Sequence, residues 1–149
     1  MKRIVAVVLF LATSLAAIMP AQARDTKLLL PIEAGMESKS AGEKLDGSVK
    51  FYFGTQKHPK ILAKLGSDST SKKTNAFNKT DEVACNWAFL SAMVALEKRA
   101  HALGANAVVN IVSNYSNHQF SSNTEFECHA GGIMAGVALK GDFVKIGNK

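Results

Sequence analysis

The spacing of apolar residues predicts one long helix in the middle of the chain. Between positions 80 and 103, apolar side chains recur every three or four residues, as expected for a helix with one buried face. Thr80 is suited to the N-cap position, two acids follow it, and Gly104 is suited to end the helix. We therefore predict a helix over 80–103 that carries Trp87 in its buried apolar face.

Alternation of apolar and polar residues predicts strands on both sides of this helix. The predicted strands are Ser48–Phe53, Ala107–Val112, Thr124–Cys128 and Ile133–Ile146. Gly136 and Gly141 indicate a bulge or bend in the last of them. This order predicts an α+β fold, with one long helix packed on a small, mainly antiparallel sheet of about four strands.

Two further segments lack a clear apolar period. Residues 24–47 mix Gly, Ser, Lys and Glu, which predicts a flexible N-terminal arm before a single α+β domain over 48–149. Residues 55–78 are polar and contain Pro59 and a run of Gly and Ser, which predicts a loop. Within it, the short apolar piece Ile61–Ala63 with Leu65 could form a turn of helix or an edge strand.

The N-terminus has the pattern of an export signal. Lys2 and Arg3 precede an apolar run over 4–18, and a small-x-small motif ends at Ala23. The run of about 15 residues falls short of the roughly 20 that cross a bilayer, so a cleaved signal is favoured over an uncleaved anchor. We expect cleavage after Ala23, a location in the periplasm or outside the cell, and no transmembrane anchor in the mature form.

The cysteine count is even, which in an exported chain predicts a disulfide. Cys85 and Cys128 would close a loop of 44 residues, and loop entropy assigns such a bond about 4 kcal/mol. The alternative is a metal site, since His129 follows Cys128 directly. No ligands are closely spaced, however, and neighbouring residues of a strand point to opposite faces. We therefore expect neither a metal nor a cofactor.

Motifs of common catalytic sites are absent from the sequence. It contains no phosphate-binding loop, no His-Glu-x-x-His and no Gly-x-Ser-x-Gly. Glu125 and Glu127 share one strand face and could act as an acid/base pair, but a solvated face explains them more simply. We expect a protein that is not an enzyme. The alternative is a small periplasmic hydrolase that uses His58, His129 and nearby carboxylates.

Lysines provide the candidate binding residues. The formal charge is +6, or +4 without the two basic residues of the signal, which is too mild to predict a nucleic-acid partner. Residues 55–79 carry six lysines against one acid. This predicts a non-enzymatic envelope accessory protein that contacts an envelope protein or an anionic polymer; alternatives are a solvated loop and a secreted effector. The proposed contacts are Lys57, Lys60, Lys64, Lys72 and Lys73.

Several sequence blocks resemble a family of small secreted bacterial proteins that are often labelled "excinuclease ATPase subunit". The resemblance spans residues 49–146. Its blocks are Phe51–Pro59, Cys85–Ala92, Gly104–Ile111, Phe126–Gly131 and Ala135–Gly141. The family implies no established activity, and the ATPase label has no support because no ATP-binding motif exists here.

A fainter resemblance, from the helix onward, is to the outer-membrane lipoproteins that sense stress for the Rcs phosphorelay. Asn106–Val108 and Gly136–Leu139 match strands of those proteins. The resemblance implies a similar fold and a bond between Cys85 and Cys128. The chain lacks the lipid-bearing cysteine and a second disulfide, so membrane tethering and signalling are not implied.

Overall fold

The computed structural model describes residues 23–37 and 39–147. Its strands are β1 (Thr26–Pro31), β2 (Lys50–Phe53), β3 (Ile61–Asn75), β4 (Ala107–Tyr115), β5 (His118–Phe120), β6 (Glu125–Ala130) and β7 (Met134–Ile146). Its helices are α1 (Ile32–Met36), α2 (Lys39–Lys44) and α3 (Asp81–Leu103). The predicted signal peptide lies outside the described residues, except for Ala23. No helix within the described part of the chain is long and apolar enough to span a membrane.

The seven strands form one mixed sheet around β7. The order is β1-β6-β7-β4-β2, while β3 pairs with the other edge of β7 and β5 pairs with β4. The β2–β4 pair is parallel, and the other described strand pairs are antiparallel. The predicted class, α+β with one helix on about four strands, is therefore wrong, because residues 23–37 and 39–147 form seven strands and three helices.

The largest error concerns β3, which occupies most of the segment predicted to be a loop. This strand of 15 residues runs antiparallel to β7, from Ile61 opposite Ile146 to Asn75 opposite Met134. It lies at an edge of the sheet and is largely exposed, so it carries no apolar alternation. Its backbone hydrogen bonds to β7 define it instead, and apolar patterns do not report these bonds.

The segment predicted to be a flexible arm also belongs to the folded domain. Residues 26–31 form β1 along β6, and α1 and α2 follow. Gly35 of α1 lies so close to α3 that a Cβ atom there would be 2.5 Å from the Phe89 ring. A flexible arm was therefore the wrong prediction for most of residues 24–47.

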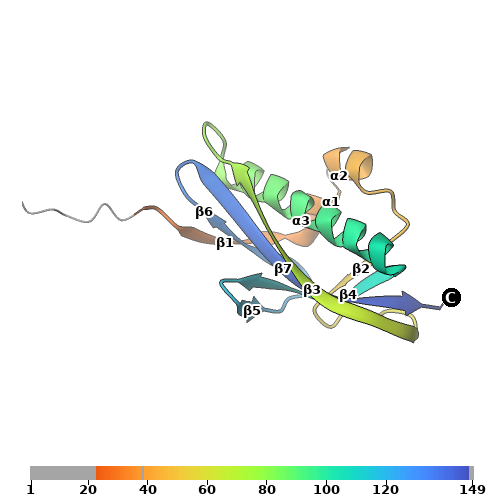
Figure 1. Cartoon of the computed structure of the whole chain (residues 1–149). Helices are drawn as coiled ribbons and strands as arrows, with labels where there is room; N and C mark the ends of the chain where they lie inside the picture. Colours follow the sequence, from red (N-terminus) through yellow and green to blue (C-terminus); the bar gives the residue numbers. More distant parts are fainter. Residues whose placement is uncertain (1–22, 38, 148–149) are drawn as a thin grey trace, which may run out of the picture.

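Helix α3 is confirmed at almost the predicted bounds. The Thr80 hydroxyl accepts a hydrogen bond from the Val83 amide (3.3 Å), and Gly104 ends the helix with a left-handed φ of 71°. Figure 1 shows α3 lying along β7 and β3 on one side of the sheet. The main core lies between α3 and the sheet, where the Phe89 ring stacks on Phe126 at 4.1 Å between centroids.

The other face of the sheet carries a smaller apolar cluster. Its buried members are Ala107, Val109, Val144 and Ile146, and Tyr52 and Ile61 pack against them. This cluster lies near the β2 end of the sheet. Polar side chains lie on other parts of that face.

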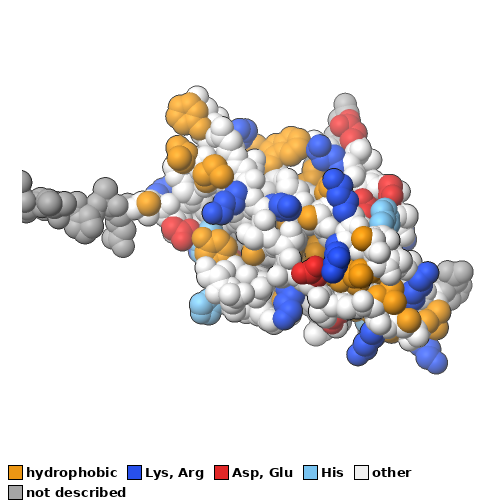
Figure 2. Space-filling view, in the orientation of Figure 1, with side chains coloured by type: hydrophobic (Ala, Val, Ile, Leu, Met, Phe, Trp, Pro, Cys, Tyr) orange, Lys and Arg blue, Asp and Glu red, His pale blue; other side chains and the backbone are white. Residues whose placement is uncertain are grey.

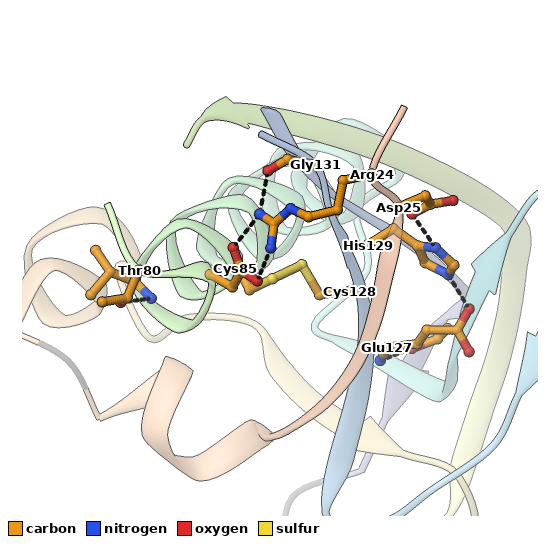
Figure 3. Close-up of a disulfide and its surroundings, with 11 residues drawn as sticks. Arg24, Asp25, Thr80, Cys85, Glu127, Cys128, His129 and Gly131 are labelled. Carbon is orange, nitrogen blue, oxygen red and sulfur yellow. Dashed lines mark hydrogen bonds and ion pairs between the residues drawn. A yellow bond between two sulfur atoms is a disulfide. The ribbon is translucent and has the colours of Figure 1, made fainter. Parts of the chain in front are cut away.

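The predicted disulfide is present and joins α3 to β6. Cys85 and Cys128 are both fully buried, and their Cα atoms are 5.8 Å apart. Close by, the Arg24 guanidinium donates to both oxygens of Asp81 (2.7 and 2.9 Å) and to the carbonyl of Gly131 (2.7 Å), as Figure 3 shows in part. The start of α3 is therefore tied to the sheet covalently and to the N-terminal segment by ion pairing.

Candidate functional site

A groove of about 370 Å³ runs along the exposed side of α3. Its lining residues are Lys44, Lys72, Trp87, Ser91, Val94, Ala95 and Lys98, and we call this site the Trp87 groove. On the face shown in Figure 2, lysine and arginine side chains border hydrophobic ones around α3. The groove thus combines cationic and apolar contacts.

Three separate elements bring the groove residues together. On α3, Trp87, Ser91 and Lys98 follow one stripe of the helix, and the Ser91 hydroxyl donates to the Trp87 carbonyl (2.8 Å). Lys72 of β3 lies opposite Val137, a core residue beneath α3, so its side chain is on the helix side of the sheet. Lys44 ends α2 and completes the border.

The charges of the three lysines are not compensated within the described structure. None of these lysines forms an ion pair or a side-chain hydrogen bond with another described residue, and no acidic residue lines the groove. Nearby Arg99 differs, because its guanidinium lies 3.1 Å from the Asp68 carboxylate. The groove is therefore a local positive field beside an aromatic ring, a combination that attracts anions.

The structure divides the five lysines proposed from the sequence. Lys72 joins the Trp87 groove. Lys73 is the next residue of the same strand and lies opposite Gly136, so its side chain is on the other face of the sheet. The remaining three are exposed near the start of β3: Lys57, Lys60 and Lys64.

Sequence reasoning missed the rest of the groove. The prediction that Trp87 is a core residue was wrong, because its side chain is 40% exposed. Lys98 follows Trp87 by eleven residues, about three helical turns, so helical spacing could have placed both on one side of α3. Lys44 had no such signal, because its position depends on how α2 packs.

A second polar cluster lies on the opposite face of the sheet and surrounds His129. Its Nδ1 atom is 2.9 Å from an Asp25 oxygen, and its Nε2 atom is 2.9 Å from a Glu127 oxygen (Figure 3). The Tyr115 ring stacks on the imidazole at 3.5 Å between centroids, with 6° between the planes. The imidazole is therefore fixed on both edges and covered on one face.

Glu127 links this cluster to β1. Its carboxylate is buried, and the Lys27 ammonium forms an ion pair with it. Burial alone would raise the pKa of Glu127, but hydrogen bonds from Lys27 and His129 outweigh this effect and lower the pKa. The Glu127 carboxylate is thus held by an ion pair and a hydrogen bond, which fits a structural role for this residue.

A third cluster has the composition of a catalytic triad without its geometry. The Ser48 hydroxyl lies 2.7 Å from His101 Nε2, and an Asp46 oxygen lies 3.6 Å from the same nitrogen. In a Ser-His-Asp relay the acid orients the ring through the other nitrogen. Because Ser48 and Asp46 share Nε2, this arrangement does not form that relay.

The histidines considered for a hydrolase occupy separate environments. His58 packs edge-on against Tyr52 and contacts the Pro59 carbonyl, whereas His129 belongs to the cluster described above. The disulfide also occupies both sulfur atoms, so neither cysteine is available to a metal. Across residues 23–37 and 39–147, no group of three or more potential ligands is arranged to hold a metal ion.

Comparison with protein-family models, with curated proteins and with solved structures gives no match for this chain.

Proposed function

We propose that the chain is an exported, non-enzymatic envelope protein that binds an anionic polymer in the Trp87 groove. The observation that carries this proposal is the convergence of Lys44, Lys72 and Lys98, from three different elements, around an exposed tryptophan. Solubility alone does not require lysines from three elements to line one groove beside an exposed aromatic ring.

The chemistry of the groove favours sulfate, phosphate or carboxylate groups carried on a chain. Ammonium groups act as point charges that tolerate many anion geometries, and the indole provides an apolar surface for the backbone of the polymer. The buried disulfide is compatible with an oxidising compartment, where the predicted export signal would place the protein.

Trp87 provides a direct readout, because it is the only tryptophan in the chain. Titration of the mature protein with dextran sulfate should change the Trp87 fluorescence at low salt, and added salt should reverse the change. The triple variant Lys44→Ala/Lys72→Ala/Lys98→Ala should weaken binding by about 100-fold, since each lysine near an anionic surface contributes about 1 kcal/mol and three are removed.

A matched control removes the same charge elsewhere, through Lys57→Ala/Lys60→Ala/Lys64→Ala. This second triple variant should bind like the unmodified protein if the groove is the site. Equal loss in both variants would show that only net charge matters. Loss confined to the control would place the contact near the start of β3, at the lysines proposed from sequence.

A further inference from the structure

On the face of the sheet opposite α3, a second groove of about 340 Å³ lies between β3 and the β4–β5 turn. Its lining residues are Ser69, Thr70, Ser71, Lys73, Asn114, Tyr115, Ser116, Asn117 and Ala138, and we call this site the Tyr115 groove. We propose that it binds an oligosaccharide, with one sugar ring packed on Tyr115 and an acidic substituent directed toward Lys73.

The aromatic side chain of the groove, Tyr115, is held in a fixed position. One face of Tyr115 is covered by the imidazole of His129, and that imidazole is itself fixed by the carboxylates of Asp25 and Glu127. Because His129 covers one face, the tyrosine presents to the groove its other face or its edge. Sugars pack through C–H groups against such fixed aromatic rings, which lose little entropy on binding.

Small residues leave space beside the Tyr115 ring. His129 of β6 is paired with Gly136 of β7, and Gly136 is paired with Lys73 of β3, so these residues form one row across the sheet. Gly136 contributes no side chain between the histidine and the lysine. Ala138, two residues further along β7, contributes only a methyl group to the floor of the groove.

Several polar side chains of the groove do not take part in hydrogen bonds that stabilise the fold. The side chains of Ser71, Lys73, Asn114 and Asn117 form no hydrogen bond with another described residue. By contrast, Asn110 on the same face donates to the Asp142 carboxylate (2.8 Å). Free hydroxyl and amide groups beside an aromatic ring suit a ligand with many hydroxyl groups.

The turn that carries two of these amides has a defined backbone. Ser116 and Asn117 both have positive φ (49° and 63°), and Tyr115 pairs with His118. These are features of a two-residue hairpin turn of the primed type, whose twist matches that of the strands. The turn therefore holds Asn114 and Asn117 at the edge of the groove.

The test is an NMR titration of the mature protein with two probes, chitotetraose (neutral) and a hyaluronan tetrasaccharide (acidic). We expect shifts of backbone amides in 69–73 and 114–117 with both probes, tighter binding of hyaluronan, and no change in Trp87 fluorescence with the neutral chitotetraose. Absence of shifts with both probes, or shifts confined to the Trp87 groove, would overturn the proposal.

Substitutions test whether the aromatic ring of Tyr115 itself contributes to binding. Tyr115→Leu should weaken binding of both probes about tenfold, whereas Tyr115→Phe should retain it. Lys73→Ala should remove the preference for hyaluronan. The matched control is Tyr52→Leu, which alters the only other tyrosine of the chain, on the far side of the same face. Full affinity in Tyr115→Leu would contradict the proposal.

A second variant covers the case in which Tyr115→Leu fails to fold. Asn114→Ala/Asn117→Gly removes both amides, and glycine retains the positive φ of position 117. This variant should melt like the unmodified protein and bind both probes more weakly. Unchanged affinity would overturn the proposal independently of the tyrosine.

Discussion

At the scale of single residues, Glu97 is a buried carboxylate whose negative charge is only partly stabilised by its surroundings. It lies on the core-facing part of α3 and is only 5% exposed. Burial raises its pKa, and the nearby negative charge of Asp46 raises it further. The Asp46 amide donates a hydrogen bond to the Glu97 carboxylate (3.2 Å), which offsets part of this effect.

Replacing this carboxylate with a neutral amide should therefore stabilise the protein near neutral pH. A raised folded-state pKa means that the glutamate is best tolerated below its ordinary pKa of 4.5 and that stability declines as pH rises through the folded-state value. Glu97→Gln keeps an acceptor for the Asp46 amide. We expect a melting temperature higher by a few degrees at pH 7, as is usual for changes of about 1 kcal/mol.

The pH dependence is the decisive part of this measurement. The gain from Glu97→Gln should shrink as the pH falls and vanish near pH 4, where the native carboxyl is also neutral. Glu125→Gln serves as the control, because Glu125 is exposed at the start of β6. An equal gain at every pH would mean that packing, and not charge, distinguishes the amide from the acid.

At the scale of elements, the sequence predicted the helix that buries apolar side chains. It missed the edge strands, which are defined by backbone hydrogen bonds to their neighbours. Helix α3 was predictable because its apolar spacing and both of its caps are local signals. Strand β3 was not, because Ser, Thr and Lys predominate over 67–74 and its pairing with β7 leaves no local signal. Likewise β1 lies at the other edge of the sheet and was mistaken for part of an arm.

The glycines of β7 indicated an irregularity in the sheet, but the sequence did not show which strand contains it. A bulge or bend was predicted in this strand, but the register shifts lie in its neighbours. Two are near the start of β3, and one is in β4 between Val109 and Val112, where Asn110 has a φ of 52°. Gly141 of β7 is the residue that permits it, because the side chains of β4 approach its backbone closely. The glycine thus marks a bulge in the partner strand.

Adding a methyl group at this glycine should be costly. A Cβ atom at Gly141 would lie 2.6 Å from a Val108 methyl and 3.2 Å from Ile111. Both are fully buried, so little room exists for adjustment. We expect Gly141→Ala to lower the free energy of unfolding by about 1–3 kcal/mol in urea titrations. Gly132→Ala, which meets nothing within 4 Å, is the control and should be nearly neutral.

At the scale of the whole molecule, the two candidate grooves lie on opposite sides of one sheet and share β3 as a border. Lys72 contributes to the Trp87 groove and Lys73 to the Tyr115 groove, because successive residues of a strand face opposite ways. The lysine-rich segment singled out in the sequence therefore contributes one lysine to each of the two proposed grooves. Its strand conformation divides them between two sites, and a loop would not have imposed that division.

The disulfide should contribute most of its stability through the unfolded chain. Cys85 and Cys128 close a loop of 44 residues, and removing the bond should lower the free energy of unfolding by about 4 kcal/mol. For a domain of this size that corresponds to a melting temperature lower by on the order of 15 °C. The measurement compares the unmodified protein with Cys85→Ala/Cys128→Ala, each with and without reductant during the scan.

The Trp87 groove should keep its geometry without the disulfide, provided that the Cys85→Ala/Cys128→Ala variant is studied well below its melting temperature. The disulfide connects α3 to β6, whereas Trp87 and Lys98 are positioned against Lys72 by the packing of α3 on β3 and β7. We therefore expect the double variant to bind dextran sulfate with nearly unchanged affinity although it melts earlier. Equal melting with and without reductant in the unmodified protein would contradict the stabilising role. Loss of binding in a folded variant would show that the bond positions α3 as well as stabilising it.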